Sequence, residues 1–192
     1  MERSLIRKEV APFLLMFGAL LLATTVVDGL LHFFDLVWVG RYLGIPGVVF
    51  ILLSFLYSLR KRKIIAFGNP KSMLQLHIAL TWSGSLMILV HAGIHLYALL
   101  PWLALLAMLL NVISGMTGMY LMGRSRRFLE SKREHYRQQG LDDEAIDRKL
   151  FRDSIAYGLM KKWREVHLPI TLLFAVLASA HIASVFLFWQ WR

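Results

Sequence analysis

Residues Met73–Leu100 read MLQLHIALTWSGSLMILVHAGIHLYALL, an apolar stretch with three histidines, His77, His91 and His95, and no Lys, Arg, Asp or Glu. A membrane-spanning helix needs roughly 20 mostly apolar residues, because each residue adds about 1.5 Å and the hydrocarbon core is about 30 Å thick. Ionisable side chains are costly inside a membrane and usually have a function there. The stretch therefore predicts a transmembrane helix whose histidines are candidate functional residues.

The whole chain is as apolar as this stretch suggests, since 57% of its 192 residues are hydrophobic. This exceeds the share in ordinary soluble domains. A proline between two apolar runs, Pro101, is expected to mark the hairpin between the third and fourth spans. The predicted spans are Val10–Phe33, Leu43–Leu59, Met73–Leu100, Pro101–Met122 and Leu168–Trp191. We expect one all-α domain over residues 1–192, an integral membrane bundle of five transmembrane helices.

The basic residues indicate how the bundle is oriented. All but two of the 22 Lys and Arg residues, Arg41 and Arg192, fall on one side of the predicted membrane. Cytoplasmic loops carry such an excess, so we expect the N-terminus inside and the C-terminus outside. The basic residues flank apolar spans and form no recognisable nucleic-acid-binding motif, which argues against a nucleic-acid partner.

The connection between the fourth and fifth spans, residues 123–164, is basic and is the only sizeable polar segment. A run of spaced apolar residues after Leu141 predicts an amphipathic helix near the membrane surface: Ile146, Leu150, Phe151, Ile155 and Leu159. The connector contains no phosphate-binding glycine loop or catalytic triad. It is either a solvated connector or a surface that docks a partner or specific lipids.

Cysteine is absent from the chain. This excludes disulfides, thiolate-bound iron–sulfur clusters and covalent attachment of haem within it. A metal centre would therefore use histidine, carboxylate or methionine ligands.

Four histidines form two pairs with the same spacing. Thirteen residues separate His77 from His91, and thirteen separate His167 from His181. Fourteen helical steps of about 100° end about 40° short of four turns, so the members of each pair lie on nearly the same helix face, about 21 Å apart along the axis. Such pairs can provide ligands at two depths of the membrane.

The predicted topology matches these depths, because the third and fifth spans run in the same direction. His77 and His167 then lie near the cytoplasmic side, and His91 and His181 lie nearer the outside. Each level offers one imidazole from each helix, which suits bis-His ligation of two non-covalent b-type haems stacked across the bilayer. Polar packing of the four histidines is the alternative.

Other residues near these histidines are secondary candidates. Gly84, midway between His77 and His91, either makes room for a porphyrin edge or serves ordinary helix packing. Pro169 either begins the fifth span or kinks a helix that continues from the connector, which makes His167 the least secure ligand. Three basic residues are positioned to pair with the propionates of the inner haem: Lys71, Lys162 and Arg164.

The two histidine pairs resemble those of the di-haem b-type cytochrome superfamily, which includes quinol-oxidising cytochrome b subunits and ferric-reductase-like membrane domains. Their placement on the third and fifth spans is similar to the latter group. The resemblance covers residues 73–191 and implies that the paired histidines bind haem iron. Ferric reductases usually add a flavin- and nicotinamide-binding region, for which these 192 residues leave no room, so a ferric-reductase-like role is expected to need another subunit as electron donor.

The resemblance implies transmembrane electron transfer between the quinone pool and an extracytoplasmic redox partner subunit. Such a chain would be the electron-transfer subunit of a respiratory oxidoreductase complex in a bacterial or archaeal cytoplasmic membrane. Two alternatives stay open. One is a metal- or oxygen-reductase core fed by a separate flavoprotein, and the other is a haem-free membrane transporter or scaffold.

A polar cluster is expected at the outer ends of the first and third spans. His95 lies one turn beyond His91 and is an alternative ligand, a propionate contact, a quinone hydrogen-bond partner or a simple interfacial residue. Asp28 and His32 are four residues apart and share a helix face. They could accept protons when a quinol is oxidised. An aqueous helix end is the alternative.

Overall fold

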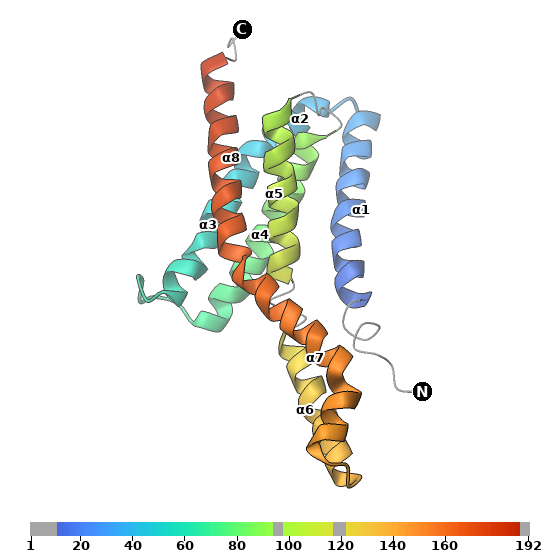
Figure 1. Cartoon of the computed structure of the whole chain (residues 1–192). Coiled ribbons are helices and arrows are strands. Elements are labelled where there is room, and N and C mark those ends of the chain that lie inside the picture. Colours follow the sequence, from blue (N-terminus) through green and yellow to red (C-terminus); the bar gives the residue numbers. More distant parts are fainter. Residues whose placement is uncertain (1–10, 94–97, 117–121, 189–192) are drawn as a thin grey trace. The chain divides into compact units, whose positions relative to one another are not determined.

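The computed structural model describes residues 11–93, 98–116 and 122–188, and within these ranges the chain is all-helical (Figure 1). The described helices are α1 (Ala11–Phe33), α2 (Val37–Tyr42), α3 (Gly44–Lys61), α4 (Pro70–Ala92), α5 (Leu99–Met116), α6 (Met122–Gln138), α7 (Asp143–Glu165) and α8 (His167–Phe188). The all-α prediction is confirmed.

Five segments of the described chain are long and apolar enough to cross a membrane, as predicted. They are Leu14–Phe33, Val37–Lys61, Pro70–Ala92, Leu99–Met116 and His167–Phe188. Large apolar side chains on these helices are strongly exposed; Leu15, for example, is 74% exposed and Leu187 is 76% exposed. Apolar surfaces of this extent are stable in contact with lipid and not with water, which indicates an integral membrane protein.

The boundary between the third and fourth spans differs from the prediction. α4 ends at Ala92, because Gly93 adopts a positive φ of 50°, a conformation that glycine tolerates and a helix does not continue through. α5 begins at Leu99, so Pro101 lies in its first turn, where a missing backbone N–H costs nothing. The predicted break between the third and fourth spans is confirmed, but it lies before Pro101 and not at this residue.

The chain divides into two compact units, which we describe separately. The first contains the described residues up to Phe17 together with those in Ile113–Leu173, and so holds α6, α7 and the first two turns of α8. The second contains Gly18–Val112 and the described residues from Phe174 onward.

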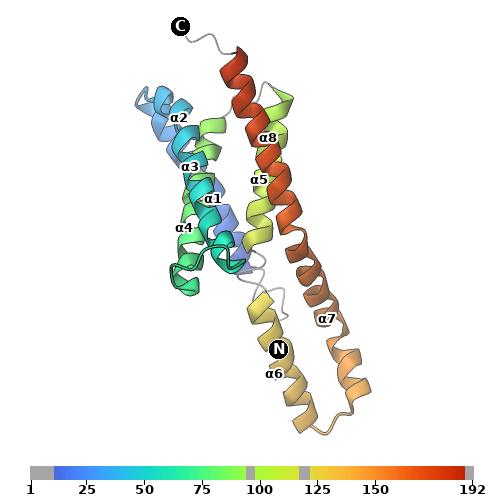
Figure 2. The same cartoon turned by 90° about the vertical axis from the view of Figure 1, so that its left-hand side faces the viewer.

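In the second unit α3 and α4 pack closely side by side (Figure 2). Glycines allow this approach: a Cβ added at Gly47 would lie 2.8 Å from Ile88 Cγ1, and one added at Gly84 would lie 3.0 Å from the Gly47 carbonyl oxygen. An apolar core joins α1, α4, α5 and α8 in the same unit. Its buried members are Leu20, Leu89, Ala107, Met108 and Phe174.

In the first unit α6 and α7 form an antiparallel helical hairpin (Figure 1). The side-chain carboxylate of Asp142 caps α7 by accepting a hydrogen bond of 3.0 Å from the Ala145 backbone N–H. Ile146 and Leu150 are buried, whereas Phe151 is 62% exposed. The predicted helix is confirmed, but its apolar residues do not form one buried face, because Ile155 is also exposed. Its location near the membrane surface stays a prediction.

Candidate functional site

The second unit holds two of the predicted ligands on one continuous helix. α4 runs from Pro70 to Ala92, with the Asn69 side chain accepting a hydrogen bond of 2.9 Å from the Lys71 backbone N–H at its start. His77 and His91 therefore lie on nearly one face, about 21 Å apart along the axis, as the spacing predicts.

His77 is oriented by α3. Its Nδ1 atom lies 3.0 Å from the backbone carbonyl oxygen of Ser54, and its ring centroid lies 5.4 Å from that of Tyr57. A carbonyl oxygen can only accept a hydrogen bond, so Nδ1 is the donor. In the neutral imidazole the lone pair is then on Nε2, which is available to a metal.

His91 repeats this arrangement one level along the helix. Its Nδ1 donates to the backbone carbonyl oxygen of Arg41 over 2.7 Å. Gly44, the first residue of α3, lies against the ring, because a Cβ added there would be 2.9 Å from His91 Cγ and Cδ2. Both histidines of α4 thus have the same tautomer and leave Nε2 for a ligand.

His181 lies on the part of α8 that belongs to the same unit. This part of α8 runs in the same direction as α4 (Figures 1 and 2). His181 and His91 lie within electrostatic range of one another. The two histidines predicted for the outer level therefore lie in the same unit, and their shared ligation of a haem stays a prediction.

His167 belongs to the first unit and is the first residue of α8. A single residue, Val166, separates α7 from α8, and Pro169 lies in the first turn of α8. The proline has no N–H to donate to the Glu165 carbonyl, so it accompanies a one-residue interruption between the two helices. Gly115 lies close to the His167 ring, since a Cβ added at Gly115 would be 3.4 Å from His167 Cε1. The pairing of His167 with His77 stays a prediction, because the two residues lie in different units.

The surroundings of His77 and His91 suit axial ligation of haem, which stays a prediction. The described part of the chain contains no group of three or more His, Asp or Glu side chains that could hold an ion. A bis-His haem needs only one imidazole on each face. Metal-ligating histidines usually donate their other ring N–H to a carbonyl or carboxylate, as His77 and His91 do here.

The secondary candidates are placed differently. Gly84 packs against α3, so ordinary helix packing accounts for its size. Lys71 is exposed at the start of α4, and Lys162 is exposed on α7. Arg164 lies on the last turn of α7, and the description does not extend to its side chain. Pairing of these basic residues with propionates stays a prediction.

At the predicted outer polar cluster, α1 brings a carboxylate and an imidazole together. His32 Nδ1 lies 2.9 Å from the Asp28 backbone oxygen and 3.7 Å from Asp28 Oδ2. Asp28 Oδ1 would lie 3.7 Å from a Cβ at Gly93, just past the α4 turn that carries His91. The expected same-face arrangement of Asp28 and His32 is confirmed, whereas His95 lies outside the described residues.

Several residues at the site are absent from the sequence predictions. The carbonyls of Ser54 and Arg41 orient the ligands, and Gly44 fits the His91 ring. Lys61, at the end of α3, lies within electrostatic range of His77 and is a further basic candidate at that level. A backbone carbonyl has no sequence signature, although the small residues of the Gly44-Ile45-Pro46-Gly47 stretch indicate a close helix contact.

No family model, curated protein or solved structure matches the chain. Functional inference therefore rests on the residues of this chain and their arrangement.

Proposed function

We propose that this protein is a di-haem membrane cytochrome b subunit that carries electrons across the bilayer. The observation that carries the proposal is the paired tautomer of His77 and His91. Each directs Nδ1–H to a backbone carbonyl, and the two lie about four turns apart on one membrane helix. A buried imidazole N–H needs an acceptor in any role, so the support comes from the equal spacing of the histidine pairs together with the Nε2 atoms that His77 and His91 leave for a ligand.

In this proposal His91 and His181 hold the outer haem, and His77 and His167 hold the inner one. When bound, haem supplies one-electron Fe(III)/Fe(II) chemistry. The chain would contribute the axial imidazoles, and the carbonyls of Ser54 and Arg41 fix the tautomers of His77 and His91.

The electron donor at the outer level is a quinol in this proposal. Quinol oxidation releases protons, and the Asp28–His32 pair beside the end of α4 is the proton acceptor that the chain offers there. Electrons from this quinol would cross from the outer haem to the inner one. In the opposite direction, an extracytoplasmic redox partner subunit would exchange electrons at the outer haem and the quinone would react at the inner haem. The orientation is N-terminus inside and C-terminus outside, in a bacterial or archaeal cytoplasmic membrane.

Transfer across the membrane can be measured in proteoliposomes that contain the haem-loaded full-length protein and trapped ferricyanide. Impermeant dithionite is added outside. We expect the trapped ferricyanide to be reduced well above the rate in protein-free liposomes, because the ligand levels lie near opposite membrane surfaces. His135→Ala, on the exposed face of α6, is the control and should not change the rate. A rate equal to that of empty liposomes would rule out transmembrane transfer.

A further inference from the structure

The charges of the α6–α7 hairpin are unevenly distributed along its length. In an antiparallel hairpin the start of α6 and the end of α7 lie at the same end, here residues 122–130 and 157–165. We refer to these two ranges as the basic end. It contains six basic residues: Arg124, Arg126, Arg127, Lys161, Lys162 and Arg164. Its only carboxylates are Glu130 and Glu165.

The rest of the hairpin is close to charge-balanced, and four of its six carboxylates form ion pairs. These pairs are Arg137–Asp143 at 3.1 Å, Lys132–Asp153 at 3.6 Å, Arg148–Glu144 at 4.0 Å and Arg133–Asp147. At the basic end, Arg126 donates to Glu130 over 2.8 Å. This hydrogen bond and the charge of Glu130 raise the pKa of Arg126, which therefore stays cationic.

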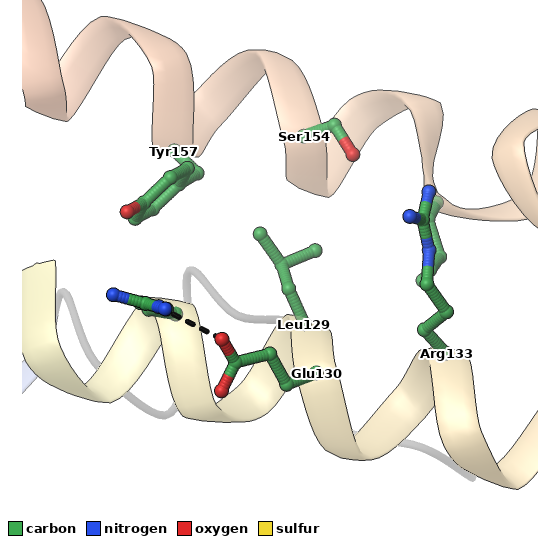
Figure 3. A pocket seen from close by; sticks show the side chains of 7 residues that line it. Leu129, Glu130, Arg133, Ser154 and Tyr157 are labelled. Atoms are coloured by element: carbon green, nitrogen blue, oxygen red, sulfur yellow. Dashed lines mark hydrogen bonds and ion pairs between the residues drawn. The ribbon is translucent and has the colours of Figure 1, made fainter.

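A cavity of about 290 Å³ between α6 and α7 is not the centre of this positive charge (Figure 3). Leu129 and Leu150 form part of its lining, and its two arginines are each engaged by a carboxylate: Arg126 by Glu130 and Arg133 by Asp147. The excess charge lies instead on the two helix segments of the basic end.

The basic end adjoins the membrane boundary. α7 is separated from α8 by a single residue, and α8 begins a membrane span at His167. Lys162 precedes this residue by five positions, or about 8 Å of helical rise. The last residues of α5 belong to the same unit. Trp163, between Lys162 and Arg164 in the sequence, is of the type that is enriched at membrane interfaces.

We propose that the basic end binds the anionic headgroups of phospholipids in the adjacent leaflet. Each Lys or Arg near an anionic surface strengthens association by about fivefold. Six lie here within two short helix segments, opposed by only two carboxylates, Glu130 and Glu165. The position against a membrane boundary favours lipid over an acidic protein as the occupant. This inference does not depend on haem binding.

The test uses hydrogen–deuterium exchange of the full-length protein in phosphatidylcholine vesicles with and without a fraction of phosphatidylglycerol. Headgroup binding should slow exchange of the basic end by severalfold when phosphatidylglycerol is present, and should leave the tip, residues 131–151, unchanged. The effect should vanish at about 1 M salt, where the Debye length falls to about 3 Å.

Two variants with equal charge loss localise the binding. Arg124→Gln/Arg126→Gln/Arg127→Gln should abolish most of the slowing, because three of the six cations are removed. Arg148→Gln/Lys149→Gln/Arg152→Gln, on the rest of α7, should retain it. Equal exchange in both vesicle types, slowing of the tip as well, or persistence at high salt would each overturn the proposal. The comparisons of vesicle type and of salt concentration use the native chain. They therefore test headgroup binding even if the arginine triple variant fails to fold.

Discussion

Replacing His91 with alanine should remove one of the two haems and leave the other, so that the purified variant holds about half of the native haem. His91 is the predicted ligand with the best-defined surroundings, since its ring is fixed by the Arg41 carbonyl and lies within electrostatic range of His181. Without the imidazole the outer haem loses one axial bond. The pyridine haemochrome assay per mole of protein measures the loss.

The partner histidine and a distant one supply the controls. His181→Ala should remove the same haem as His91→Ala, so the double variant should lose no more than either single variant. His77→Ala and His167→Ala should instead remove the other haem. His135→Ala should retain both. If His91→Ala and His181→Ala affected different haems, the assignment of ligand levels would be refuted.

Gly44→Val should selectively disturb the outer haem. A Cβ at this position would lie 2.9 Å from two atoms of the His91 ring, so the valine must displace the imidazole from the position set by the Arg41 carbonyl. Overpacking of this kind costs about 1–3 kcal/mol, which weakens outer-haem binding by about 5- to 150-fold. Redox titration and electron paramagnetic resonance should show a changed signal from one haem only.

Gly18→Val is the matched control, because nothing lies within 4 Å of a Cβ added at that position of α1. It introduces the same side chain into a membrane helix of the same unit, and both haem signals should stay native. Equal changes in the two variants would indicate a general loss of stability. An unchanged outer haem in Gly44→Val would show that the ring of His91 is not an axial ligand.

The sequence predicts the membrane helices well, because apolar length has a direct physical meaning in a bilayer. The sequence-based prediction places the junction of the third and fourth spans incorrectly, because both Gly93 and Pro101 are residues that can end a helix. Pro101 is the more prominent helix breaker, yet a proline is compatible with the first turn of a helix. Gly93 ends α4 through its positive φ, which depends on the local backbone and is not evident from an isolated glycine.

At the candidate site, too, some features are predictable from the sequence and others are not. The spacing of His77 and His91 predicts their shared face, since helical periodicity alone determines it. The carbonyls that fix their tautomers come from Ser54 and Arg41, 23 and 50 residues away in the chain. Such contacts depend on the packing of α2 and α3 against α4, which the identity of neither residue reveals.

Gly84 illustrates how one residue can satisfy two interpretations. Its position between the histidines suggests space for a porphyrin edge, whereas its contact with Gly47 explains its size through helix packing alone. The position of a residue on a helix face can be predicted from the sequence, but its packing partner depends on which helix lies against that face.

The haem content of the purified wild-type protein tests the central proposal most directly. The protein is expressed with an adequate haem supply, and haem is quantified per chain alongside a potentiometric titration of the reduced spectrum. We predict two b-type haems per chain, titrating as two one-electron centres. A pure, folded protein with no reducible b-type spectrum would contradict the proposal and favour a haem-free role for the four histidines.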